Sequence, residues 1–162
     1  MSTTPKTYAT NKLYVIEAAV KARLEAVTIG NGFQTAPTTL FVTPPSDDTT
    51  DAGPWLVYRF NNEELVDVAH GGQYTMAATF VIDGYFKRTS SMTDRQVLQY
   101  ALKLLQDLRT TISGWVEIFQ LAGAIQVQIG SMIRDDGFLS ESSGLVMFSQ
   151  PVVLTYKNIG AW

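Results

Sequence analysis

The 162-residue sequence contains no cysteine and only one histidine, His70. Without cysteine the chain cannot form disulfides, iron–sulfur clusters, thiolate zinc sites or a thiol nucleophile. A single imidazole cannot supply a multi-histidine metal site, and we expect His70 to be an ordinary loop residue. The sequence motifs of P-loop nucleotide binding, serine hydrolases and zinc proteases are absent as well. We therefore predict that the protein is not an enzyme and uses no cofactor and no metal ion.

Charged residues and long apolar runs are also scarce. Charged side chains make up 17% of the chain and the net charge is −3, so the overall positive charge that nucleic-acid binding requires is missing. No apolar run approaches the roughly 18 residues of a membrane-spanning helix, and residues 1–10 lack the apolar centre of a signal peptide. A chain of this length can bury a sizeable core on its own. We predict a mobile N-terminal arm at residues 1–10, one domain at residues 11–162, and no membrane association.

The stretch 73–111 has the clearest periodicity in the chain. Its first part alternates, with apolar residues at even positions: Tyr74, Met76, Ala78, Phe80, Ile82 and Phe86. Thr75, Thr79, Asp83 and Lys87 occupy odd positions, which predicts a strand with one buried face and one largely wet face. Its second part repeats with the period of a helix, at Val97, Ala101, Leu104, Leu105, Leu108 and Ile112. Thr93-Asp94-Arg95-Gln96 has the form of a capping box that begins this helix.

The other elements are predicted from shorter patterns. A first helix follows from apolar residues at helical spacing, namely Leu13, Ile16, Val20, Leu24 and Val27. Residues 38–42 and 55–60 are predicted to be two strands of a hairpin, and the polar stretch 61–67 a turn or a single helical turn. Two further strands are predicted at 125–129 and 145–157, with Pro151 at a bulge or a sheet edge. Together these elements predict an α+β fold, a mostly antiparallel β-sheet with two α-helices packed on one face.

Two long loops carry the charged residues that have no obvious role in the core. In the loop 43–54 three acids lie close together, but their spacing does not match an EF-hand calcium loop. In the segment 130–144 a pair of adjacent acids leaves three readings open, a general acid and base, a pair of metal ligands, or a turn before Gly137, and the turn is favoured. Loops of this length are usually functional or ordered by contact. We therefore predict interface residues in both loops and in the basic loop after the long strand: Asp47, Asp48, Asp51, Lys87, Arg88, Arg134, Asp135, Asp136 and Phe138.

Four stretches of apolar spacing carry a resemblance to a known family. They are Ile16-Glu17-Ala18-Ala19-Val20 through Leu24, Ala77-Ala78-Thr79-Phe80-Val81-Ile82, Asp94-Arg95-Gln96-Val97-Leu98, and Val152-Val153-Leu154-Thr155-Tyr156. With these stretches the chain, over about residues 11–157, resembles the tail terminator proteins of tailed bacteriophages, also called tail completion proteins. The acidic loop 46–53 has no equivalent in this resemblance.

The resemblance implies a structural virion protein that forms a hexameric ring at the head-proximal end of the tail. Such a ring stops polymerisation of the tail tube and joins the tail to the neck or head connector. The implied partners are further copies of the chain, the tail-tube protein and the connector, with a sheath protein as a further candidate. DNA passes through such a ring without specific binding. The implied location is the tail or neck of the virion, after assembly in the bacterial host cytoplasm.

Two alternatives to a tail terminator remain open. Another head–tail connector or tail-tube structural protein would share the fold class but polymerise or dock differently. A small ligand-binding domain or an enzyme is less favoured, and a deep pocket lined by Asp135, Asp136 and His70 would support it.

Overall fold

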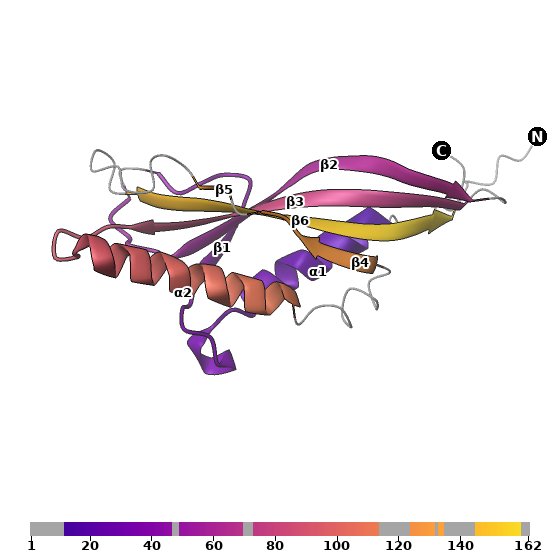
Figure 1. Ribbon diagram of the computed structural model, residues 1–162. Helices are drawn as coiled ribbons and strands as arrows, with labels where there is room; N and C mark the ends of the chain where they lie inside the picture. The colour runs from indigo at the N-terminus through magenta and orange to yellow at the C-terminus, as the bar shows by residue number, and fades with distance from the viewer. Residues whose placement is uncertain are drawn as a thin grey trace, which may run out of the picture.

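The computed structural model describes residues 12–46, 49–69, 73–113, 124–131, 133–134 and 145–159. In chain order its elements are α1 (Lys12–Glu25), a short 3-10 helix η1 (Ile29–Asn31), β1 (Thr38–Phe41), β2 (Trp55–Ala69), β3 (Gln73–Lys87), α2 (Asp94–Ser113), β4 (Ala124–Ile129), β5 (Ile133–Arg134) and β6 (Leu145–Ile159). Figure 1 shows one long twisted sheet with both helices beneath it. The predicted α+β class is confirmed, whereas the predicted N-terminal arm lies outside the described residues.

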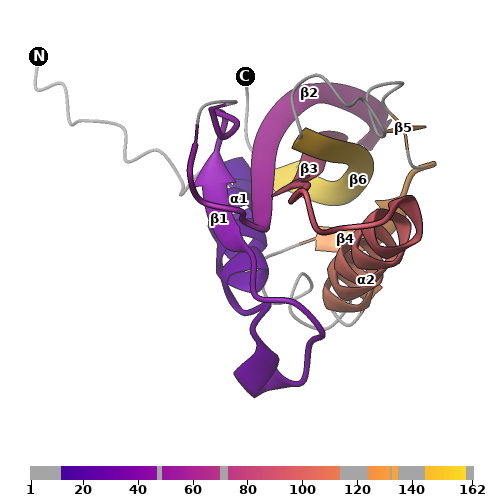
Figure 2. The same ribbon diagram turned by 90° about the vertical axis from the view of Figure 1, so that its left-hand side faces the viewer.

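The sheet has the strand order β1-β2-β3-β6-β4, and β5 pairs with β6 beyond the end of β4. β3 lies in the middle and pairs with β6 along its whole length, from Gln73 opposite Ile159 to Lys87 opposite Leu145. The even positions of β3 from Met76 to Phe86 are buried in the core and Tyr74 is half-buried, as the alternation predicts. Seen end-on in Figure 2, β2 arches over β3 and β6 while α1 and α2 lie on the concave side.

Both helices contribute to one hydrophobic core. Ile16, Val20 and Leu24 of α1 are at most 1% exposed. All six residues of the predicted α2 stripe are buried in the same core. The capping box is also confirmed, since the Thr93 N–H donates to Gln96 Oε1 at 2.8 Å and the Gln96 N–H donates back to Thr93 Oγ1 at 3.3 Å. These reciprocal bonds satisfy backbone donors that a helix start otherwise leaves unpaired.

Asp107 is a buried acid on α2 that the periodicity does not predict. Its carboxylate accepts hydrogen bonds from the Gln34 N–H at 3.1 Å, the Thr35 N–H at 2.7 Å and the Thr35 hydroxyl at 2.7 Å. Three donors offset the cost of removing the carboxyl group from water. Asp107 therefore fastens α2 to the segment between α1 and β1.

The predicted hairpin of residues 38–42 and 55–60 is wrong, because β1 and β2 are parallel. Thr38 lies opposite Trp55 and Phe41 opposite Tyr58. After β1 the chain turns at Val42, which has a φ of 64°, and returns to the start of β2 beside the end of β3. There the Lys87 N–H donates to the Ala52 carbonyl at 2.9 Å. The hairpin rule holds for short loops, whereas the connection 42–54 is long enough to run back along a four-residue strand.

The predicted turn at residues 61–67 is also wrong, because β2 continues unbroken to Ala69. Glu63 lies opposite Ala78 and Leu65 opposite Met76 on β3, with register irregularities between Phe60 and Asn62 and between Leu65 and Asp67. Pairing with a long neighbouring strand outweighs the weak strand preference of Asn and Glu.

The face of β3 that the alternation predicts to be wet is partly covered. Val81 is 8% exposed and Asp83 is 4% exposed. The Asp83 carboxylate accepts hydrogen bonds from Arg59 Nε at 3.2 Å and from the Ser149 hydroxyl. A polar residue at an odd position thus serves as a buried acceptor here, because β2 and β6 place donors on either side of it.

Pro151 lies in the interior strand β6, so its predicted place at a sheet edge is wrong. Its carbonyl accepts from the Gly130 N–H at 2.9 Å, just beyond the end of β4. The N–H and C=O of one residue in an antiparallel strand point toward the same neighbour, so the N–H that proline lacks would face the Gly130 carbonyl. That carbonyl instead accepts a hydrogen bond from the Gln150 side-chain Nε2 at 2.6 Å, which replaces the missing ladder bond.

Gly84 lies opposite Phe148 in the ladder of β3 and β6. A Cβ atom at this position would come within 2.3 Å of the Phe148 ring. The glycine is required because the aromatic ring packs directly against the backbone of β3.

Candidate functional site

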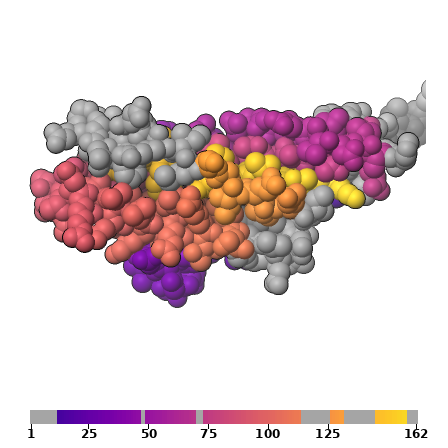
Figure 3. Space-filling model, viewed as in Figure 1, coloured from indigo at the N-terminus to yellow at the C-terminus, as the bar shows by residue number. Residues whose placement is uncertain are grey.

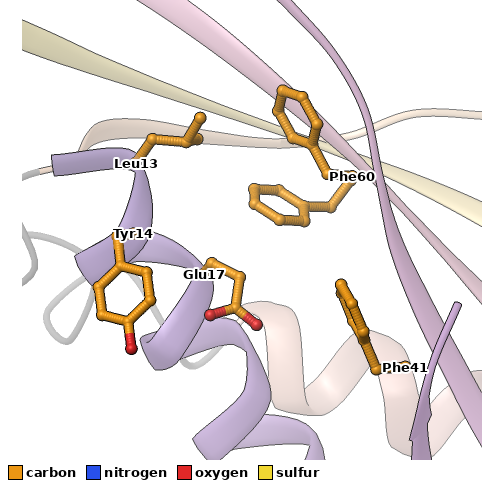
Figure 4. A pocket seen from close by; sticks show the side chains of 6 residues that line it. Leu13, Tyr14, Glu17, Phe41 and Phe60 are labelled. Carbon is orange, nitrogen blue, oxygen red and sulfur yellow. The ribbon is translucent and has the colours of Figure 1, made fainter. Parts of the chain in front are cut away.

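An open apolar groove of about 470 Å³ lies between α1 and the β1–β2 edge of the sheet. Figure 4 shows Tyr14 and Glu17 of α1 facing Phe41 of β1 and Phe60 of β2 across it. Phe60 also contacts Phe80 of β3, with ring centroids 5.7 Å apart. Tyr14 is 71% exposed and Phe41 is 58% exposed, so much of the aromatic surface here has no cover among the described residues.

Glu17 is the one acidic residue among the described residues that line this groove. It accepts a hydrogen bond from the Tyr58 hydroxyl at 2.7 Å. Burial of Tyr58, and after it the hydrogen bond to Glu17, raise the pKa of that hydroxyl far above its ordinary value. The polar groups of the groove thus satisfy each other, and the arrangement suits apolar contact better than proton transfer.

A second feature is the free edge of β2, which we call the acidic edge and define as residues 60–69. β1 covers β2 only as far as Tyr58, and no other described segment pairs with β2 on that side. Four apolar side chains on this edge are between 44% and 58% exposed: Phe60, Leu65, Val66 and Val68. The charged residues of the same stretch are all acidic: Glu63, Glu64 and Asp67. Burial against the sheet raises the pKa of Glu63.

A third feature is the outer side of α2, which we call the basic helix face. Its members are Arg95, Leu98, Leu102, Lys103 and Arg109 of α2 and Ile129 of β4. Leu98 is 47% exposed and Leu102 is 52% exposed, and both lie outside the core stripe of the helix. Leu102, Arg109 and Ile129 line an open hollow of about 520 Å³. The two acids of α2 do not offset its positive charge, because Asp94 lies in the first turn next to Arg88 and Asp107 is buried.

The acidic edge and the basic helix face lie toward opposite edges of the sheet. β2 is near one edge of the sheet and β4 forms the other. In Figure 3 the salmon surface of α2 runs from the left end to the middle of the view, and the magenta surface of β2 lies at the upper right. The described surface therefore carries two unlike apolar patches of opposite charge.

The structure describes the side chains of only three of the predicted interface residues, Asp51, Lys87 and Arg88. Asp47, Asp48, Asp135, Asp136 and Phe138, like His70, lie outside the described residues, and only the backbone of Arg134 is described, in β5. Asp51 is exposed, and its Oδ1 accepts from the Gly53 N–H at 3.0 Å within its own loop.

The two predicted basic residues contact their own chain. Lys87 Nζ donates to the Thr49 carbonyl at 2.7 Å, which attaches the loop 43–54 to the end of β3. Arg88 forms an ion pair of 2.7 Å with Asp94 and so lies against the start of α2. Lys87 thus contacts the acidic loop of its own chain.

Sequence reasoning missed both charged surfaces. Leu98 and Leu102 are spaced four residues apart and fall outside the predicted stripe, so the exposed apolar pair on α2 could have been read from the sequence. The acidic edge could not, because residues 61–67 were predicted as a turn and the strand order decides which strand lacks a neighbour.

Among the described residues no cluster of three or more His, Asp or Glu side chains is arranged to hold a metal ion. In the part of the chain that is described, no helix combines the length and the apolar character needed to cross a membrane. No protein-family model matches the sequence, and no curated protein shows significant similarity to it. The chain is thus an α+β protein with two exposed apolar surfaces that carry opposite charge.

Proposed function

We propose that the protein is a structural subunit that assembles with copies of itself into a closed ring, as the tail terminator proteins of bacteriophages do. The observation that supports this is the presence of two unlike apolar surfaces at opposite edges of one sheet. A ring of identical subunits uses a head-to-tail interface, in which each subunit offers two different patches. Exposed apolar patches bordered by polar residues are typical of protein contact sites.

In this proposal the ring caps the head-proximal end of a phage tail, stops polymerisation of the tail tube and joins the tail to the neck or head connector. The resemblance in apolar spacing supports this place in the virion. The loops 43–54 and 130–144 are the proposed contacts with the tail-tube protein, the connector and, as a further candidate, a sheath protein. A net charge of −3 favours a channel through which DNA slides without being held.

A second candidate is a tail-tube or head–tail connector subunit. The free edge of β2 favours it, because an unpaired strand edge is also a template for open-ended association. The two candidates differ in where assembly stops, since a terminator forms one ring and a tube subunit continues to stack.

The test is the mass of the purified protein by light scattering, alone and with tail-tube subunits of the same phage. We expect a discrete ring-sized oligomer that binds tube ends and fixes tube length. Leu102→Asp should abolish the ring, whereas Ala22→Asp, which places the same charge on an exposed position of α1, should leave it intact. Open stacks would favour the tube subunit, and a persistent monomer that never caps tubes would contradict both.

A further inference from the structure

We propose, building on the ring function above, that the acidic edge of one subunit docks on the basic helix face of the next copy. The contact joins strand β2 of one chain to helix α2 and the end of β4 of its neighbour. A helix laid along an open strand edge is one of the ways in which proteins cover such edges.

Charge is the first argument for this pairing. Residues 60–69 carry Glu63, Glu64 and Asp67 and no base. The exposed side of α2 carries Arg95, Lys103 and Arg109. Contact between two acidic edges or between two basic faces would oppose like charges, which costs several kilocalories per mole in general. Opposite charges thus favour head-to-tail contact and disfavour a symmetric dimer.

The apolar groups are the second argument. Leu65, Val66 and Val68 are each more than half exposed on the edge. Leu98, Leu102 and Ile129 are each at least 40% exposed on the helix face. None of these six side chains belongs to the core of the described monomer. Docking removes both sets from water at once.

The free backbone groups of β2 need partners when they are buried. The exposed amides of Gln99 and Gln106 lie on the same helix. A glutamine side chain offers both donors and an acceptor, and the arginine and lysine side chains add further donors. The helix face can therefore satisfy the N–H and C=O groups of the edge as it covers them.

A second copy of the chain accounts for both surfaces together. A different basic protein would cover the acidic edge but leave the helix face exposed, and an acidic protein would do the reverse. Because the two surfaces are distinct and lie toward opposite edges of the sheet, each subunit can donate its edge to one neighbour and receive the edge of another.

The test uses two variants that each lose one surface. The edge variant carries Leu65→Asp and Val68→Asp and keeps its helix face. The face variant carries Leu98→Asp and Leu102→Asp and keeps its edge. We expect each variant to be monomeric by light scattering, and a 1:1 mixture to form a heterodimer that grows no further. Circular dichroism and thermal melting check that both variants are folded.

Charge reversal tests the pairing with variants that keep the apolar groups. Glu63→Lys with Glu64→Lys, or Arg95→Glu with Lys103→Glu, should each weaken assembly at least tenfold. The two reversals combined in one chain should recover most of it. The wild-type assembly should weaken as salt rises from about 0.05 to 0.5 M, because exposed charges are then screened.

The outcomes separate this contact from the proposed function. If the mixture of the two variants stays monomeric while the wild type forms rings, the proposed contact is wrong but the proposed ring function still stands. A surface variant that still self-associates alone would also overturn it. A heterodimer from the mixture, with a wild type that never caps tubes, would support the contact and contradict the terminator role.

Discussion

The two parts of strand β2 have opposite surroundings although they pair with the same neighbour. Residues Trp55–Tyr58 have β1 on one side and β3 on the other and are at most 5% exposed. Beyond Tyr58 β3 is the one neighbour of β2 among the described strands, and Leu65, Val66 and Val68 are more than half exposed. The ladder to β3 continues through both parts, so pairing alone does not explain the difference. The first part stabilises the monomer, and the second keeps apolar residues that the monomer does not bury.

The largest expected effect follows from truncating one leucine in each part. Leu56→Ala should lower the free energy of unfolding by about 3 kcal/mol, because Leu56 is fully buried and the change leaves a cavity. Leu65→Ala should change it by about 0.5 kcal/mol or less, yet weaken assembly. Urea unfolding measures the first quantity and light scattering the second. Equal losses of unfolding free energy in the two variants would show that both parts of β2 stabilise the monomer to the same extent, which would contradict this comparison.

At the junction between the two parts of β2, Arg59 forms an ion pair with Asp83 of β3. Asp83→Ala removes the acceptor of the buried Ser149 hydroxyl and of Arg59. We expect a loss of about 2 kcal/mol in the free energy of unfolding, because a buried donor is left without a partner. Glu64→Ala is the control, since it removes an exposed acid from the neighbouring strand and should cost about 0.5 kcal/mol or less. A loss of unfolding free energy in Glu64→Ala as large as that in Asp83→Ala would show that the acidic edge also stabilises the monomer, which would contradict this comparison.

The smallest expected effect concerns Tyr58, at the end of the buried part. Its raised pKa means that the folded protein keeps the hydroxyl proton at a pH where the unfolded chain, with a pKa of about 10, loses it. The stabilisation is therefore present below about pH 10 and is lost as pH rises further. Tyr58→Phe should cost about 1 kcal/mol near neutral pH through the lost bond to Glu17. It should also reduce the fall in unfolding free energy between pH 9 and 11, and an unchanged fall would contradict this account.

Local patterns were enough to predict β3, α2 and the start of α2. The alternation from Tyr74 to Phe86, the helical stripe and the capping box each depend on neighbours a few residues apart. The parallel pairing of β1 depends on the path of a long loop, and Asp107 depends on backbone donors more than seventy residues away. Neither leaves a local signal. The acidic edge depends on strand order, so it was the least accessible to sequence reasoning.

The position of β6 has a consequence for how the chain is made. β6 follows every other described element in the sequence, yet it lies between β3 and β4, with Val152 opposite both Phe80 and Ile129. On the ribosome β4 therefore emerges before the strand to which it pairs. Ile129, and with it the complete basic helix face, cannot be fixed in place until residues 145–159 have been synthesised. If the basic helix face receives the acidic edge of a neighbour as proposed above, a nascent chain can accept that neighbour only after its own sheet is closed.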